Sequence, residues 1–167
     1  MSLKDFPTPT ANAALSLAGH GIPVLALAPG SKKPRRGSRG VREATTITGH
    51  ITLWWANTPN ANLGLACGHK FDVIDIDPRK GGRWPSGQTL PLHALVSTPS
   101  GGWHLYVPVG LLSDTTMRGD GWDYQARGAY VVAPPSPGYE WVIGWSDVAK
   151  PFTLVGKGDR DEVAVWV

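Results

Sequence analysis

Two aspartates lie at the centre of an apolar segment that has the pattern of a β-strand. The segment runs from Phe71 to Pro78 and places Asp75 and Asp77 two residues apart. Because side chains alternate faces along a strand, both carboxylates lie on one face, roughly 6–7 Å apart along the strand. This spacing suits a hard divalent cation such as Mg²⁺ or Mn²⁺, or two cations, which would also remove the repulsion between the two acids. The simpler alternative is that Asp77 opens a turn and Asp75 is solvated at a sheet edge.

Other polar residues further along the chain fit phosphoryl transfer, which depends on cations, charge clamps and positioning more than on covalent chemistry. Asp123 is a third carboxylate in a strand-like segment, and His104 follows the turn Ser100-Gly101-Gly102. A glycine-rich turn offers backbone N–H groups to phosphate oxygens, and a histidine can donate to a triphosphate oxygen. Taken singly, a strand histidine is more often structural, and such a turn is most often only a turn.

The net charge of +3 is unevenly distributed, because six cations fall in one short segment. Clustered Lys and Arg side chains favour phosphate-bearing partners, above all nucleic acid. Several glycines in this segment predict a mobile loop, and the alternative is a solvated loop without a partner. The cations are Lys32, Lys33, Arg35, Arg36, Arg39 and Arg42.

Composition favours one globular domain. Of the 167 residues, 41% are hydrophobic and 17% are charged, which is enough apolar sequence for a real core. The single cysteine, Cys67, excludes an internal disulfide and a cysteine-rich zinc site. The sequence has neither a signal-peptide pattern nor a run of about 20 apolar residues, so we expect a soluble, cytoplasmic protein without a membrane partner.

The order of the expected elements predicts an α+β fold: two helices come first and short strands joined by turns follow. We expect the segments 94–98 and 103–107 to pair as one hairpin and 122–125 and 130–133 as another. Weak helix signals lie near 145–149. The expected helices are 11–18 and 48–57, and the expected strands are 22–27, 62–68, 71–77, 94–98, 103–107, 122–125, 130–133 and 139–143.

Several segments, in this order and spacing, resemble the bifunctional primase/polymerase (Prim-Pol) branch of the archaeo-eukaryotic primase superfamily. The resemblance covers about residues 10–142. It rests on Val73–Asp77, on Thr98–His104, and on Asp123 followed by Gly128–Ser136. The earlier segments Gly21–Val24, Pro29–Pro34 and Asn62–Leu65 resemble the family too.

The resemblance implies an α/β N-terminal unit fused to an RRM-like unit, with mixed or antiparallel sheets around a catalytic cleft. It implies that Asp75, Asp77 and Asp123 hold a two-metal site of Mg²⁺ or Mn²⁺. Ser100, Gly101, Gly102 and His104 would bind the phosphates of nucleoside triphosphates. The expectation that Lys32 to Arg42 bind nucleic acid rests instead on their clustered charge. The activity would be template-directed DNA priming or polymerisation on single-stranded DNA template and primer, in phage, plasmid or mobile-element replication.

The sequence also predicts a domain plan, and the resemblance implies a partner. We expect residues 1–9 to be a flexible leader, 10–145 the catalytic domain, and 146–167 a tail or the start of a linker. Such domains are often joined to a replicative helicase, so the chain is either a stand-alone protein or part of a larger one.

Two positions depart from the family pattern. Gln125 stands where the family commonly has an arginine, and Ala129 replaces a frequent glycine; Arg127 is a candidate substitute cation. Two other functions also stay open. One is a non-catalytic module that binds nucleotides or single-stranded nucleic acid through the basic segment and exposed aromatics such as Trp54, Trp84 or Trp103. The other is a metal nuclease.

Overall fold

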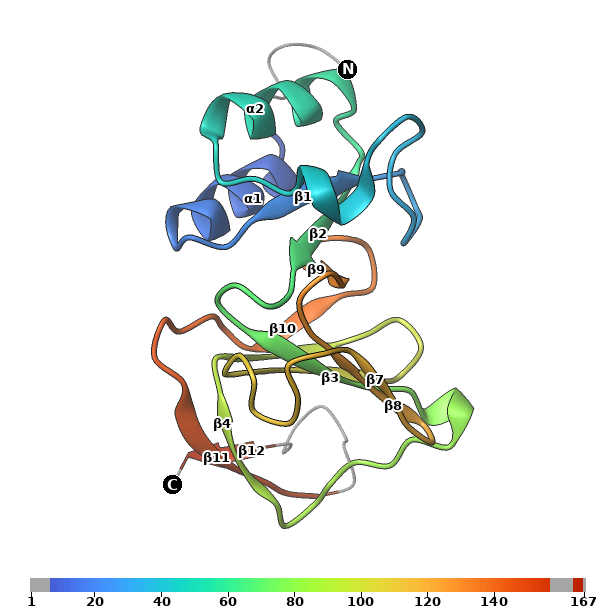
Figure 1. Cartoon of the computed structure of the whole chain (residues 1–167), viewed down its shortest axis with the longest axis vertical. Coiled ribbons are helices and arrows are strands. Elements are labelled where there is room, and N and C mark those ends of the chain that lie inside the picture. The colour runs from blue at the N-terminus through green and yellow to red at the C-terminus, as the bar shows by residue number, and fades with distance from the viewer. Residues whose placement is uncertain (1–6, 157–163, 167) are drawn as a thin grey trace.

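Two helices and a three-stranded sheet form one half of the molecule. The computed structural model describes residues 7–156 and 164–166. The helix α1 packs against β1 and β2, and α2 packs against β1 and α1. Both strands are buried along their whole length, which explains their near-continuous apolar sequence. The sheet has the antiparallel order β1-β2-β9 (Figure 1). The bounds are α1 Pro9–Gly19, β1 Val24–Leu27, α2 Thr48–Asn57, β2 Asn62–Ala66 and β9 Tyr130–Ala133.

A six-stranded sheet forms the centre of the other half. Its order is β10-β5-β6-β3-β8-β7, and every pairing in it is antiparallel. β3 therefore lies inside the sheet with a strand on each side. The bounds are β3 Asp72–Ile76, β5 Ala94–Ser97, β6 Trp103–Val107, β7 Met117–Arg118, β8 Trp122–Gln125 and β10 Glu140–Ile143.

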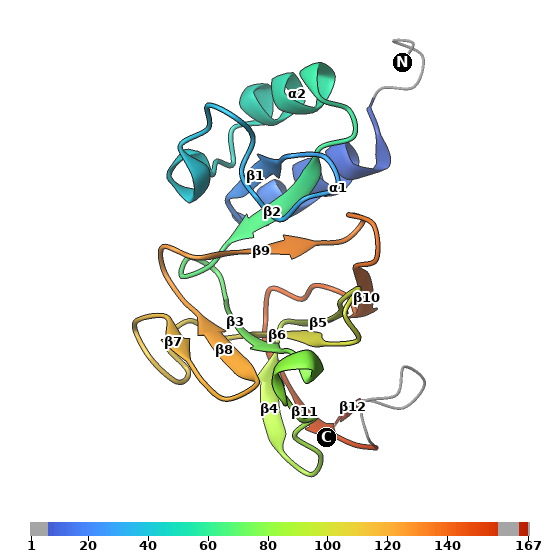
Figure 2. The same cartoon turned by 90° about the vertical axis from the view of Figure 1, so that its right-hand side faces the viewer.

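The two faces of this sheet belong to two different hydrophobic cores. Val73 and Tyr106 pack into the core that contains the helices, whereas Ile76 and Leu105 pack into a second core on the opposite face. Because side chains alternate along each strand, every second residue of β3 and β6 is directed toward the helical half. Figure 2 shows β9 passing between the helical layer and the six-stranded sheet.

A third sheet covers the second core, and the sequence did not predict it. Its order is β12-β11-β4, again antiparallel. The helix expected near 145–149 is wrong, since this segment is irregular and leads into β11. The segment 157–163, within the expected tail, lies outside the described residues, and the predicted domain boundaries stay predictions. The bounds are β4 Thr89–Leu92, β11 Lys150–Leu154 and β12 Ala164–Trp166.

One of the two expected hairpins is confirmed and the other is wrong. β5 and β6 pair across the turn at 98–102, as the sequence predicts. The segment 122–125 instead pairs with β3 and β7, while 130–133 crosses to the small sheet and pairs with β2. The chain turns from one sheet to the other at Gly128, whose φ of +92° favours glycine.

The predicted α+β class is confirmed, with two α-helices and antiparallel sheets in the described part of the chain. An RRM-like unit is not confirmed, because both helices pack against the small sheet, α1 on β1 and β2 and α2 on β1. In the described residues, no helix is long and apolar enough to cross a membrane.

Candidate active site

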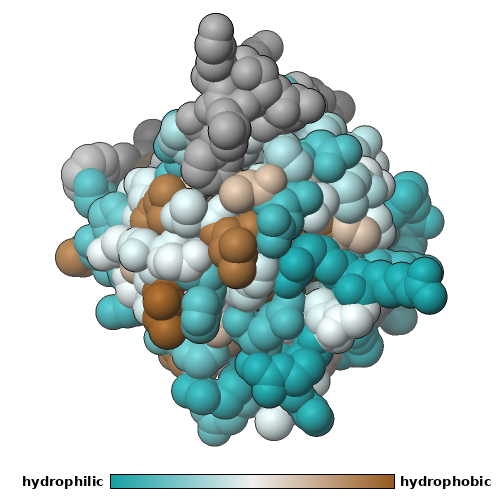
Figure 3. Space-filling model, turned by 90° about the horizontal axis from the view of Figure 1, so that it is seen from above, coloured by the Kyte–Doolittle hydropathy of each residue, from teal (hydrophilic) through white to brown (hydrophobic). Residues whose placement is uncertain are grey.

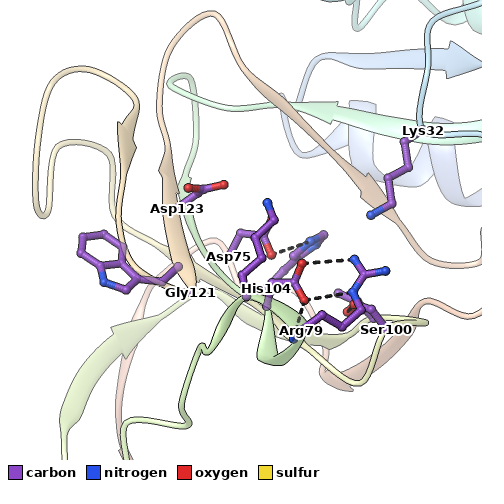
Figure 4. A pocket seen from close by; sticks show the side chains of 11 residues that line it. Lys32, Asp75, Arg79, Ser100, His104, Gly121 and Asp123 are labelled. Atoms are coloured by element: carbon purple, nitrogen blue, oxygen red, sulfur yellow. Dashed lines mark hydrogen bonds and ion pairs between the residues drawn. The ribbon is translucent and has the colours of Figure 1, made fainter.

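The strand register brings three of the predicted residues into one row. Asp75 of β3 pairs with Asp123 of β8 on one side and with His104 of β6 on the other. Directly opposed residues of an antiparallel pair share a face, with Cβ atoms about 4.5–5.5 Å apart. Asp77 follows at the end of β3. These four residues line one pocket together with Lys32, Arg79, Lys80, Thr98, Ser100, Gly121 and Trp122 (Figure 4).

Asp75 is the central acid of this pocket, and its side chain is about one-third exposed, at 32%. Burial raises its pKa above the ordinary value, and Lys32 partly opposes that rise. The neighbouring carboxylates Asp123 and Asp77 raise the pKa further. The three acids are therefore close enough to repel one another, which is the electrostatic situation that a bound cation relieves.

The other two acids are held by arginines. Arg79 binds Asp77 with two hydrogen bonds from its guanidinium, Nε to Oδ1 and Nη2 to Oδ2, both 3.1 Å. These bonds lower the pKa of Asp77, against a smaller opposing effect of burial. On β7, Arg118 Nη1 donates to Asp123 Oδ2 at 2.6 Å. Of these three acids, Asp75 alone receives no hydrogen bond from a lysine or arginine within the described part of the chain.

These pairings bear on the expected metal site. In the part of the chain that the structure describes, no three His, Cys, Asp or Glu side chains are arranged to hold a metal ion. The donor chemistry nevertheless fits Mg²⁺ or Mn²⁺, because three carboxylates line one polar pocket. Burial and the two neighbouring carboxylates raise the pKa of Asp75, and a bound cation would relieve this. A cation would bind Asp77 and Asp123 in place of Arg79 and Arg118.

His104 forms the buried wall of the pocket. Burial lowers the pKa of its imidazole to about 3, and the charge of Lys32 acts in the same direction. The ring is therefore neutral at neutral pH. Its Nε2 lies 3.6 Å from Asp75 Oδ1, which is too long for a hydrogen bond and, with a neutral ring, is not an ion pair. A neutral imidazole retains one N–H that can donate to a ligand.

The turn before His104 contributes one residue to the pocket. Ser100 lines it, with its Oγ 3.1 Å from Thr98 Oγ1. The N–H of Gly101 donates to the Thr98 carbonyl, and that of Gly102 donates to Thr98 Oγ1. A Cβ on Gly102 would lie 2.2 Å from the carbonyl oxygen of residue 76. Close packing against β3 therefore explains this second glycine, and a phosphate role for either glycine stays a prediction.

The basic segment is a loop, as its glycines predict, and hydrogen bonds within it hold it to a short 3₁₀ helix at its end. Glu43, in the short 3₁₀ helix η2 (Gly40–Glu43), accepts hydrogen bonds from Arg35 Nη2 at 3.1 Å and from Ser38 Oγ at 2.6 Å. The carboxylate also accepts from the backbone N–H of Arg39. One of the six predicted cations, Arg35, is thus used inside the loop, while Lys33, Arg36, Arg39 and Arg42 are exposed.

Lys32 is the residue whose place the sequence did not predict. We expected it on a nucleic-acid surface, but its ammonium extends from the loop into the pocket of Asp75 and His104 (Figure 4). Its backbone is fixed from the small sheet, because Tyr130 Oη donates to the Lys32 carbonyl at 2.7 Å. Asn62 Nδ2 likewise donates to the carbonyl of Ser31 at 3.0 Å. The sequence indicated a special place for this lysine only through the segment Pro29–Pro34, which resembles the family and follows the predicted strand 22–27.

Lys32, and not Arg127, is the cation that lies beside Gln125. Arg127, the candidate substitute cation, lines neither the catalytic pocket nor its neighbour, and its backbone packs where a Cβ on Gly68 would lie. Lys32 and Gln125 instead line an adjoining pocket with Tyr130 and Tyr139, and Asp75 and His104 belong to both pockets.

Comparison with protein families agrees with this geometry. The model of the N-terminal domain of bifunctional DNA primase/polymerases matches residues 14–151. The chain belongs to the Prim-Pol family. The match covers every residue of the pocket and of the basic segment. Family membership supports a primase/polymerase-type function with nucleotidyltransferase-type chemistry on a DNA template. No curated protein matches the chain.

Proposed function

We propose that this protein carries out template-directed, divalent-metal-dependent nucleotidyl transfer, making or extending DNA primers in the replication of a phage, plasmid or other mobile element. The observation that supports it is the row Asp123, Asp75 and His104 across three strands, in a pocket that also contains cations. An acidic row beside cationic side chains suits a triphosphate with its metal ions.

The acids would hold the metal ions. Asp75, Asp77 and Asp123 are the proposed ligands of Mg²⁺ or Mn²⁺. When bound, such ions lower the pKa of an attacking hydroxyl and neutralise the leaving pyrophosphate. Arg79 and Arg118 would then be released from their carboxylates, and Arg79 would be free to contact phosphate oxygens in the same pocket.

The remaining pocket residues would orient the triphosphate. Lys32 supplies a point charge from the loop side, and Ser100 supplies a hydroxyl from the turn. His104 supplies a neutral N–H donor from the buried side, because its low pKa keeps the ring uncharged. The adjoining pocket with Gln125 and Tyr139 is the proposed seat of the nucleoside, since it shares residues with the catalytic pocket.

A non-catalytic module that binds nucleotides or single-stranded nucleic acid is the second candidate. The observation that favours it is the pairing of two of the three acids with arginines, which occupies their oxygens. Such a protein would bind DNA with no dependence on metal and no nucleotide incorporation.

Primer extension with Mg²⁺ or Mn²⁺ tests the proposal. We expect Asp75→Asn, Asp77→Asn and Asp123→Asn each to lower incorporation about 10²-fold or more, because each removes a charge needed in the transition state. Asp114→Asn is the matched control, since Asp114 is exposed and lies outside the pocket. Far-UV circular dichroism checks the fold. Undiminished incorporation by Asp75→Asn refutes the assigned site, and degradation of labelled DNA without added nucleotides indicates a nuclease.

A further inference from the structure

A second basic site lies beside α2, apart from the catalytic pocket. It is a groove of about 360 Å³, within the ~300–1,000 Å³ range of ligand sites. We call it the α2 groove. Its side chains combine cations with apolar and aromatic surface: Arg39, Arg42, His50, Leu53 and Trp54, with Glu43 between them.

The positive charge of this groove is not compensated within the protein. Glu43 is occupied by Ser38 and Arg35, whose hydrogen bonds keep the pKa of this carboxyl low although burial opposes them. In the described residues, the guanidinium groups of Arg39 and Arg42 form no ion pair with a carboxylate, and Arg39 contacts Glu43 only through its backbone N–H. Two exposed guanidinium groups that point to no internal acid are suited to bind phosphate.

The start of α2 adds to the same charge. Ile47 precedes the helix and provides no side-chain cap, and the first turn carries no acidic residue. His50 lies in that first turn and lines the groove. The positive end of the helix dipole is therefore uncompensated beside the two arginines.

Apolar side chains flank the cations, and this distinguishes the groove from a simple phosphate site. Leu53 and Ile47 are 58% and 56% exposed, and Figure 3, which looks down on this side of the molecule, shows brown apolar side chains among hydrophilic ones. Trp54 carries the Arg35 guanidinium over its ring at 5.2 Å. Single-stranded nucleic acid presents both kinds of surface to a protein, because charged phosphates alternate along it with unpaired aromatic bases.

The groove is connected to the catalytic pocket by an ordered segment. Residues 32–43 have Lys32 in the catalytic pocket at one end and Glu43 in the α2 groove at the other. Hydrogen bonds from Tyr130 and Asn62 fix the first end, and the Glu43 network fixes the second. A strand that leaves the catalytic pocket along this segment would reach Arg39 and Arg42 in the groove.

We propose that the α2 groove binds the single-stranded DNA template, with backbone phosphate at Arg39, Arg42 and His50 and a base against Leu53. This inference rests on the proposed function, because the strand is identified as the template of that reaction. A protein partner for the exposed apolar residues is the competing explanation, and it predicts no dependence on the arginines and no salt effect.

The test measures the Kd of fluorescent single-stranded DNA by anisotropy at several salt concentrations, in the full chain. We expect Arg39→Ala/Arg42→Ala to raise the Kd about tenfold and to reduce the slope of log K against log salt by about 1.4, which is two contacts at ~0.7 each for a single strand. Leu53→Ala should weaken binding with little change of slope, because it removes an uncharged contact.

Lys33→Ala/Arg36→Ala is the matched control, since it removes two exposed cations of the same segment that lie outside the groove. Equal effects of the two double variants would overturn the inference and leave the proposed function intact. The binding assays are repeated in the Asp75→Asn background. If the wild-type protein incorporates no nucleotide but its DNA binding shows the Arg39/Arg42 pattern, the proposed reaction is refuted and DNA binding in the groove is supported. Nucleoside triphosphate affinity should not change in either double variant, and its loss in Arg39→Ala/Arg42→Ala would also overturn the assignment.

Discussion

Replacing Lys32 with alanine should weaken the binding of the incoming nucleoside triphosphate roughly 10- to 150-fold. The side chain extends into the catalytic pocket, and among the described residues no carboxylate forms an ion pair with it. Its charge is therefore available to phosphate. A hydrogen bond to a charged group contributes about 1.5–3 kcal/mol, and each ~1.4 kcal/mol corresponds to a factor of ten in affinity. The effect should appear in KM more than in kcat if Lys32 binds the ground state.

Tyr130→Phe provides a finer test, because it removes only the hydroxyl that donates to the Lys32 carbonyl at 2.7 Å. A neutral hydrogen bond contributes about 0.5–1.5 kcal/mol, so we expect KM to rise about 2- to 10-fold. If Tyr130 acts by positioning Lys32, this effect disappears in the Lys32→Ala background, and a double-mutant cycle measures the coupling.

Single-nucleotide extension gives KM and kcat for the wild type, both single variants and the double variant. Lys33→Ala is the control, because this neighbouring exposed lysine does not line the pocket. Lys32→Arg should restore part of the affinity. The reasoning is refuted if Lys32→Ala has the KM of Lys33→Ala, or if the effects of the Lys32 and Tyr130 substitutions simply multiply.

Three further predictions concern the pocket and its supports. Asp75→Asn should raise the urea midpoint at pH 7 in the absence of metal, because a carboxyl whose pKa is raised on folding destabilises the fold above that pKa. The gain should vanish below the ordinary aspartate pKa of 3.8, where Asp75 is protonated in both states. A lower midpoint at pH 7 contradicts this prediction. Gly102→Ala should lower the free energy of unfolding by ~1–3 kcal/mol in urea titrations, because its Cβ would meet the carbonyl oxygen of Ile76 at 2.2 Å; an unchanged stability contradicts this. Arg118→Ala should tighten Mn²⁺ binding up to about fivefold in calorimetry, because it frees Asp123 from an exposed ion pair of at most ~1 kcal/mol; weaker binding contradicts it.

The acidic strand could be predicted because its information is local. Alternation of apolar and acidic residues fixes which side chains share a face, so Asp75 and Asp77 were assigned together from the sequence. The turn at 98–102 likewise predicted the β5–β6 hairpin. That Asp123 lies opposite Asp75 depends on long-range register, which composition and periodicity do not contain; the family resemblance supplied that expectation.

The third sheet escaped prediction for a different reason. Prolines normally argue against a strand, because they cannot donate a hydrogen bond to the sheet. In this sheet Pro91 of β4 lies directly opposite Pro151 of β11. The N–H of Leu154 donates to the Gln88 carbonyl, so these two residues form a hydrogen-bonded pair. Hydrogen-bonded and non-hydrogen-bonded pairs alternate along an antiparallel ladder, and the two prolines, three positions away, therefore form a pair that exchanges no hydrogen bonds. Neither proline removes a donor that the pairing needs, and only the paired strands together show this.

The arginine pairs explain how so acidic a row can exist in the folded protein. Three carboxylates beside one another would raise one another's pKa values, and the protein moderates this with Arg79 on Asp77 and Arg118 on Asp123. Asp75 receives no such bond, and its raised pKa shows the remaining cost. Both arginines are exposed on long side chains, so their pairs are weak and exchangeable. Under the proposed function, the acids would hold these cations before substrate binding and release them when metal and triphosphate arrive, which would keep the pocket close to neutral in both states. Under the proposed function, the arginines therefore make a site that is stable enough to fold and still able to bind metal.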